Sequence, residues 1–177
     1  FSPAEAELLA AQPQPDLAQY LRGQGRHPAI ISRGYGAARS DPRVVPPDGA
    51  PRDYGDEPCL LAQRAGCPVW VGADRVAVAR ALRDAHPETD VILSDDGLQH
   101  LRLARDYEIA VVDAGRGFGN GHMLPAGPLR EPPGRLERVD AVVMTAKGGS
   151  SGQSLGPWPR SAFVAEARFR LGDAINL

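Results

Sequence analysis

A short apolar stretch that ends in two carboxylates is the feature that most constrains how this chain folds. Residues 91–100 read VILSDDGLQH. The apolar start predicts a strand buried on both faces, and the acids after it predict a ligand-binding crevice at the carboxyl end of an open α/β sheet. The alternative is a strand that runs into an ordinary Asp-Gly turn. Gln99 and His100 favour a chemical role, because a structural turn needs neither an amide nor an imidazole beside two acids.

Length and composition indicate one globular domain without a strong overall charge. The chain has 177 residues and a formal net charge of −2, so its charge gives no reason to expect nucleic acid as a partner. Cys59 and Cys67 have neither the number nor the spacing of a disulfide framework or a zinc site. We expect both to be reduced, as in a cytosolic protein. No run of about 18 apolar residues occurs, so we expect no membrane span within these residues.

Apolar segments that alternate with helical patterns predict the fold class. We expect strands at 28–32, 68–71, 91–94, 107–113 and 140–145, and helices at 16–22, from Asp56 to about residue 62, and at 74–82. Residues 163–171 alternate apolar and polar side chains, as a half-exposed antiparallel strand does. The alternation of strands and helices predicts an α/β protein with a mostly parallel sheet and helices on both faces.

Segments rich in proline and glycine predict the loops and the domain limits. Residues 40–51 contain four prolines, and residues 114–134 form a long stretch rich in both residue types. A loop as long as the second is more often functional than idle. Residues 1–15 contain one plausible helical turn that prolines interrupt. We therefore predict an atypical N-terminal segment at 1–15 and a single domain at 16–177, which the family resemblance described below implies is a partial one.

Two further turns present polar groups next to predicted elements. RGYG at 33–36 follows a predicted strand, and its glycines permit a tight turn from which Arg33 and Tyr35 project. GDEP at 55–58 opens a predicted helix with Asp56 and Glu57 in its first turn. Acids at this place also stabilise a helix through its dipole, so capping is the alternative to chemistry.

Six short motifs occur in a fixed order between about residue 16 and the end of the chain. They are RGYG at 33–36, GDEP at 55–58, DDGLQH at 95–100, the basic run at 102–106, FGNG at 118–121 and LPAGPLRE at 124–131. In order and approximate spacing they resemble the signature series of the tetraacyldisaccharide 4'-kinase family. The resemblance implies a P-loop NTPase-like, three-layer fold, with ATP and Mg²⁺ as cofactors.

The resemblance also implies an activity and a location. That family transfers the γ-phosphate of ATP to the 4'-hydroxyl of the lipid A disaccharide-1-phosphate precursor, which gives lipid IVA. It acts at the cytoplasmic face of the inner membrane of Gram-negative bacteria, and its membrane-contacting segments are absent from this sequence.

The resemblance assigns the acids to the metal and to catalysis. Asp95 and Asp96 occupy the Walker B position, which holds the Mg²⁺ that bridges the β- and γ-phosphates. Glu131 matches a further residue near the metal. Asp56 matches the carboxylate that helps to activate the sugar hydroxyl, and Glu57 would lie near the metal and phosphates.

The resemblance assigns basic and aromatic residues to charge neutralisation and substrate binding. Arg75 is a candidate for neutralising phosphate charge. The residues that match those binding the phosphorylated disaccharide in the family are Arg33, Tyr35, His100 and Arg130. Tyr35 would pack on the sugar, and Arg130 would act by its charge. Two alternatives stay open: His100 as a satisfied turn histidine, and Arg75 with Arg80 as solvated charges on a helix face.

The sequence also departs from the family's pattern. The family's Walker A loop ends in Gly-Lys-Thr-Pro, and the corresponding slot, residues 8–13, reads LLAAQP. No glycine, lysine or threonine occurs from Phe1 to Asp16, and Lys147 is the only lysine of the chain. Such a segment cannot cradle phosphates. The family's N-terminal membrane segment and the C-terminal portion that supplies a histidine partner for the catalytic aspartate are also absent.

Two interpretations of these departures stay open. The first is an incomplete fragment of the kinase with an aberrant start, which we expect to be inactive and not to bind ATP by itself. The second is a non-catalytic relative that keeps the lipid-saccharide surface without nucleotide binding. A metal-insertion GTPase is disfavoured, because no Asn-Lys-x-Asp type motif or Cys/His cluster occurs.

Overall fold

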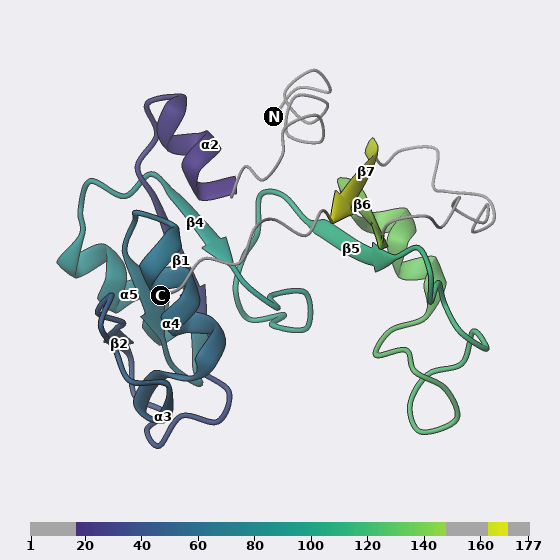
Figure 1. Ribbon diagram of the computed structural model, residues 1–177, viewed down its shortest axis with the longest axis horizontal. Coiled ribbons are helices and arrows are strands. Elements are labelled where there is room, and N and C mark those ends of the chain that lie inside the picture. Colours follow the sequence, from purple (N-terminus) through teal and green to yellow (C-terminus); the bar gives the residue numbers. More distant parts are fainter. Residues whose placement is uncertain (1–16, 148–162, 170–177) are drawn as a thin grey trace. The chain divides into compact units, whose positions relative to one another are not determined.

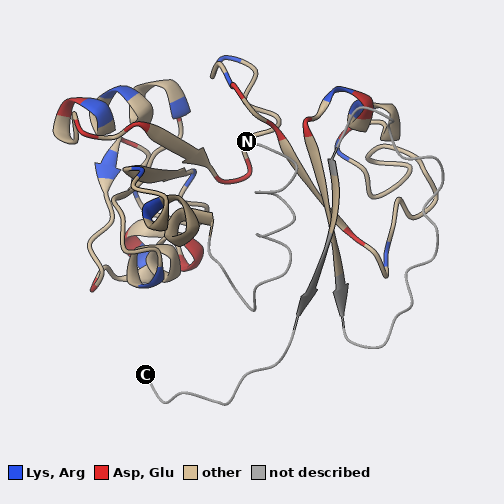
Figure 2. Cartoon of the chain, turned by 90° about the horizontal axis from the view of Figure 1, so that it is seen from above, with Lys and Arg blue, Asp and Glu red and all other residues tan. Residues whose placement is uncertain are grey.

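The chain divides into two compact units, with the boundary between Ala104 and Arg105 (Figure 1). In a computed structural model, the described residues are 17–147 and 163–169. The predicted N-terminal segment at 1–15, with its helical turn, lies outside them, so the predicted domain limits of 1–15 and 16–177 stay a prediction. Acidic and basic residues are interspersed along the helices and turns of both units (Figure 2).

The first unit is built on a four-stranded sheet with the order β2-β3-β1-β4. Its parallel strands are β1 (Pro28–Ser32), β3 (Val69–Val71) and β4 (Val91–Ser94), and β2 (Arg43–Val44) pairs antiparallel with β3. Its helices are α2 (Leu17–Gly23), α3 (Pro51–Tyr54), α4 (Asp56–Arg64) and α5 (Arg75–Ala85). The three parallel strands, α4 and α5 lie close to where the apolar periodicity predicts them.

Side chains of the fully buried strand β1 pack against helices on both faces of this sheet. Ile30 joins a core with Ala18 of α2 and Cys59 of α4. Ile31 packs in a second core with Val78 and Leu82 of α5. Successive residues of a strand point to opposite faces, so β1 contributes to both cores. This confirms the prediction of a three-layer α/β arrangement.

The second unit contains a parallel three-stranded sheet with the order β5-β6-β7. Its elements are β5 (Ile109–Asp113), β6 (Ala141–Lys147), β7 (Phe163–Phe169) and the 3₁₀ helix η1 (Pro133–Arg138). The Glu108 carboxylate, just before β5, pairs with Arg105 at 2.9 Å and with Arg135 of η1 at 2.6 Å. This double ion pair ties the far end of the long loop after β5 to the start of the sheet.

The structure corrects four predictions about the strands. The expected single sheet is two sheets within the described residues. Strand β4 is half-buried instead of buried on both faces, because among the described strands it pairs only with β1 and stands at the end of the sheet order. Strand β7 is parallel to β6, not antiparallel, and the intervening segment 148–162 is long enough for the crossover that parallel strands need. The predicted loop at 40–51 includes β2, which is too short to produce a periodic pattern.

The Asp74 carboxylate caps helix α5, and this gives a testable pH dependence. Its Oδ1 accepts hydrogen bonds from the amides of Val76 at 2.9 Å and Ala77 at 3.3 Å. These bonds hold the pKa of Asp74 below its ordinary value. A lowered folded-state pKa means that the stabilisation is present above the unfolded pKa of about 3.9 and is lost as pH falls through the folded value.

We therefore expect the Asp74→Ala variant to unfold at lower urea concentration than the wild type at pH 6 and above, because the helix loses its cap. The difference should shrink steadily below about pH 4. Urea unfolding followed by circular dichroism measures it. Asp74→Asn is the matched control, since asparagine caps a helix without titrating. A pH-independent difference between wild type and Asp74→Ala would contradict this account.

Candidate functional site

Three parallel strands of the first unit end at the same edge of its sheet, and a polar turn follows each of them. Strands β3, β1 and β4 are neighbours and run in one direction. Residues 33–36 follow β1, residues 72–74 lead from β3 into α5, and Asp95 and Asp96 follow β4. Parallel sheets bind ligands at this edge, so the fold brings these turns to the place where chemistry is expected.

Asp95 is held in place by contacts with β1 and α5. Its backbone amide donates to the carbonyl of Ile31 at 3.0 Å, which extends the pairing of β4 with β1. The Ser32 hydroxyl donates to Asp95 Oδ2 at 3.1 Å, and Arg75 Nη2 donates to the Asp95 carbonyl at 2.8 Å. The carboxylate is therefore oriented by the strand end next to it.

The turn after Asp95 is tight and leaves Asp96 in an unusual conformation. Asp96 has a φ of 50°, in the left-handed region that aspartate and asparagine tolerate better than most residues. A Cβ atom on Gly97 would lie 2.6 Å from the Ser94 hydroxyl oxygen, so only glycine fits there. The sequence Asp-Asp-Gly is thus what allows two adjacent acids to stand directly at the end of β4.

Arg75 is a buried cation beside these acids. The residue is 2% exposed, and its Nε and Nη1 atoms have no hydrogen-bond partner in the part of the chain that the structure describes. Burial lowers the pKa of the guanidinium most strongly, Arg33 lowers it further, and Asp95 and Asp96 raise it. Arg75 is therefore not a solvated charge on the helix face, which was one of the two interpretations of the sequence. Arg80, further along α5, is exposed as that interpretation requires.

Glu57, in the first turn of α4, belongs to the same group of acids. The negative charge of Asp95 raises the pKa of the Glu57 carboxyl above its ordinary value, and burial and the charge of Asp96 act in the same direction. These three carboxylates repel one another, and a bound cation would relieve the repulsion. Carboxylate oxygens are also the ligands that Mg²⁺ prefers, so the residues present fit this metal.

The RGYG turn packs directly on the residues that precede α4. Gly34 and Gly55 both have positive φ angles, 70° and 94°. A Cβ atom on Gly34 would lie 3.0 Å from the Tyr54 carbonyl oxygen, and one on Gly55 would lie 2.8 Å from the Tyr35 carbonyl oxygen. Two motifs that are some twenty residues apart in sequence thus form one close contact. The Tyr35 side chain is 90% exposed and available for stacking.

The structure brings together five of the predicted site residues, which are Arg33, Glu57, Arg75, Asp95 and Asp96. Asp56 precedes Glu57 in the first turn of α4 and is exposed. His100 and Arg75 line one groove between the start of α5 and the segment 99–103. Gly55 is the N-cap of α4 and has no side chain to cap it, but Asp56 and Glu57 both lie in the first turn, so their alternative role in stabilising the helix through its dipole stays open.

Two predicted site residues, Arg130 and Glu131, lie in the second unit. Glu131 forms an ion pair with Arg135 at 3.2 Å. Their assignment to the site therefore stays a prediction.

Ser32 is a site residue that the sequence analysis missed. It is buried, ends β1 and donates to the Asp95 carboxylate. The available signal was a hydroxyl at the carboxyl end of an otherwise apolar, buried strand. Its partner is 63 residues away, so only the pairing of β1 with β4 shows what the hydroxyl does.

Two features are absent from the described residues, a cluster of metal-ligating side chains and a helix that could span a membrane. No set of three or more His, Cys, Asp or Glu side chains at 17–147 or 163–169 is arranged to hold a metal ion. A magnesium site in a phosphate-transferring protein needs only one or two carboxylates, with phosphates and water as the other ligands. None of the helices in the described ranges is both long and apolar enough to cross a membrane.

Comparison with solved structures defines the class of protein. The structure is similar to that of the "apo" form of LpxK from Aquifex aeolicus in complex with ATP, with a TM-score of 0.63 and 25% sequence identity. The match covers 81% of this chain and 44% of that one. The fold is therefore that of the P-loop kinases.

Sequence comparison defines the family. The family model described as LpxK, tetraacyldisaccharide-1-P 4'-kinase, matches residues 15–176. A tetraacyldisaccharide 4'-kinase from Herminiimonas arsenicoxydans is 66% identical over 128 residues, which are 72% of this chain and 35% of that protein. One from Thiobacillus denitrificans is 48% identical over 164 residues, which are 91% of this chain and 48% of that protein. The chain belongs to the tetraacyldisaccharide 4'-kinase family and spans a third to a half of the length of these relatives.

Proposed function

We propose that this chain is part of an ATP-dependent kinase that phosphorylates the 4'-hydroxyl of the lipid A disaccharide-1-phosphate precursor. Membership of the family supports the reaction and the substrate. The observation that carries the proposal is the group formed by Glu57, Asp95 and Asp96 with the buried Arg75 at one sheet edge. A phosphoryl transfer site needs such oriented charges more than it needs covalent chemistry.

In this reaction an oxygen–phosphorus bond forms between the sugar 4'-hydroxyl and the γ-phosphorus of ATP. The bond from that phosphorus to the β,γ-bridging oxygen breaks, and ADP leaves. The hydroxyl proton passes to a carboxylate, for which we propose Asp56 in the exposed first turn of α4. Glu57 next to it faces the negative charge of Asp95, and Arg75 would neutralise charge on the transferred phosphate.

Asp95 and Asp96 are the residues that would hold Mg²⁺. When bound there, Mg²⁺ supplies positive charge to the β- and γ-phosphates. The hydrogen bond from Ser32 fixes the Asp95 carboxylate for this role. We propose Glu131 as a further contributor. The segment at 8–13, which occupies the slot of the family's phosphate-binding loop, lies outside the described residues.

Substrate binding is proposed for Arg33, Tyr35, His100 and Arg130. Arg33 and Tyr35 stand on the turn after β1, and His100 lines the groove beside Arg75. Arg130 would add a charge for the phosphorylated sugar. The substrate is a lipid, so we propose that the protein works at the cytoplasmic face of the inner membrane and that segments beyond this sequence contact the bilayer.

The test is phosphate transfer by the complete product of the gene that encodes this chain. We expect label from [γ-³²P]ATP to appear in the tetraacyldisaccharide 1-phosphate and to depend on Mg²⁺. The 177-residue chain is assayed beside it, and we expect it to transfer no label. A complete product that binds the disaccharide but never transfers label would favour the non-catalytic relative and contradict the kinase.

A further inference from the structure

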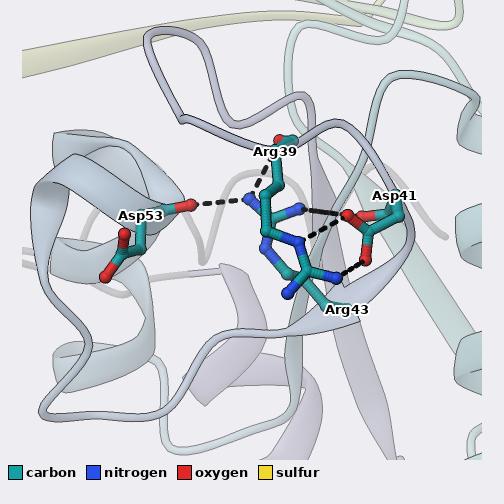
Figure 3. A network of polar contacts seen from close by, with 4 residues as sticks. All are labelled: Arg39, Asp41, Arg43 and Asp53. Atoms are coloured by element: carbon teal, nitrogen blue, oxygen red, sulfur yellow. Dashed lines mark hydrogen bonds and ion pairs between the residues drawn. The ribbon is translucent and has the colours of Figure 1, made fainter.

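Arg43 lies outside the acidic group, yet its side chain joins two backbone segments of the first unit, the loop at 39–41 and the end of α3. It stands in β2, opposite Val71 of β3, and its side chain is 13% exposed. Nη1 donates to the Asp41 carbonyl at 3.0 Å, and Nη2 donates to the carbonyls of Arg39 at 2.9 Å and Asp53 at 2.6 Å. Figure 3 shows this guanidinium between Asp41 and the main chain of Asp53.

The same guanidinium also covers the aromatic ring of Tyr54. Its Cζ atom lies 5.4 Å from the ring centroid, within the range of a cation–π contact. Arg43 therefore contacts both the carbonyl of Asp53 and the side chain of the next residue. Both contacts fall on the end of α3, directly before Gly55.

The end of α3 sets the position of the proposed catalytic acids. Gly55 is the C-cap of α3 and the N-cap of α4, so the two helices follow each other without a linker. The RGYG turn also packs against the Tyr54 carbonyl and against Gly55. A shift of residues 53–55 would therefore move Asp56 and Glu57 on one side and Tyr35 on the other.

The loop at 37–50, which contains Arg43, is also bonded to the turn before α5. The Ala73 amide donates to the Ser40 carbonyl at 2.9 Å, one residue before the Asp74 cap. The Ala38 amide donates to the Arg52 carbonyl at 3.2 Å. The loop at 37–50 is thus bonded to the end of α3 and to the turn that leads to Arg75.

We infer that Arg43 is a positioning residue that holds the start of α4, with Asp56 and Glu57, in register with the RGYG turn and the acids after β4. The inference rests on the proposed kinase function for its effect on catalysis. Its effect on local structure does not depend on that function. Arginine is required because its planar fork reaches several carbonyls while its face covers an aromatic ring.

The test compares Arg43→Met with Arg39→Met in the complete gene product. Arg39 is the matched control because its side chain lies in the same loop, is 69% exposed and, among the described residues, bonds only the Asp41 carboxylate, through Nε at 2.9 Å and Nη2 at 2.8 Å. Hydrogen exchange is measured at the amides of Tyr54, Gly55 and Cys59, whose bonds lie at the junction of α3 and α4. We expect R43M to speed this exchange about tenfold and R39M to leave it unchanged.

Kinetics give the second measurement. We expect R43M to lower kcat about tenfold with little change in the KM for ATP, because misplaced catalytic groups reduce turnover. R43K keeps the charge and the stem but not the fork, so it should fold and show an intermediate loss. Equal exchange rates in R43M and R39M would overturn the positioning role, and so would equal kcat values. If the wild type transfers no phosphate, the proposed function fails, while the exchange experiment still decides the role of Arg43.

Discussion

Replacing Asp96 with asparagine is expected to lower the kcat of the complete kinase about 100-fold, or about 2.7 kcal/mol of transition-state stabilisation. Asp96 stands in the tight turn after β4, next to Asp95 and close enough to Glu57 to raise its pKa. Asparagine keeps the size of the side chain and tolerates the φ of 50°, so the turn should survive. The variant loses only the negative charge of the carboxylate, which we propose binds Mg²⁺.

The measurement is the initial rate of phosphate transfer as a function of Mg²⁺ concentration. We expect D96N to need more Mg²⁺ for half-maximal rate, as well as to be slower at saturation. Asp84→Asn is the control, because Asp84 is an exposed residue of α5 outside the group of acids. D84N should match the wild type within about twofold. A D96N enzyme with wild-type turnover and Mg²⁺ dependence would remove Asp96 from the site.

Local patterns in the sequence were sufficient to predict the elements that form this site. Strand β1, strand β4 and helix α5 each have an apolar pattern and a clear end signal, such as the Asp74 cap or the two acids after Ser94. The three-layer arrangement follows from the alternation of such elements. Family resemblance then selected acids that the structure does place together, at Glu57, Asp95 and Asp96.

Contacts between distant residues were not predictable from these patterns. The bond from Ser32 to Asp95 depends on which strand lies beside β1. The pairing of β7 depends on the direction in which the chain returns, and periodicity contains no such information. No sequence pattern pointed to Arg43, because β2 has only two residues. The hydrogen-bond partners of Arg43 are also backbone carbonyls, which any residue type provides. Sequence patterns thus predict elements better than they predict the pairing that completes a site.

The burial of Arg75 was likewise not predictable from the sequence pattern. It leads to the second large effect that we expect. Replacing Arg75 with methionine should lower kcat about 100-fold while leaving the free energy of unfolding within about 1 kcal/mol of the wild type. The residue is 2% exposed, and the structure gives it one hydrogen bond, from Nη2 to the Asp95 carbonyl, while Nε and Nη1 are without partners among the described residues. A desolvated, incompletely bonded cation adds little to stability.

Methionine fills most of the volume of the arginine stem and removes the desolvation cost together with the repulsion from Arg33. The lost bond to Asp95 acts in the opposite direction, so the two effects on stability nearly cancel. Catalysis has no such compensation, because the transferred phosphate would lose its positive partner. Activity and stability should therefore separate in this variant.

Urea unfolding and steady-state kinetics, measured on one preparation of R75M, test this separation. Arg80→Met is the matched control, because Arg80 is an exposed residue of the same helix. R80M should keep both its stability and its turnover. If R75M instead lost several kcal/mol of stability together with its activity, Arg75 would be a structural residue. A stable R75M enzyme with full activity would show that the phosphate is neutralised elsewhere. Loss of activity at unchanged stability would show that Arg75 supplies positive charge to the site and contributes little to the free energy of unfolding.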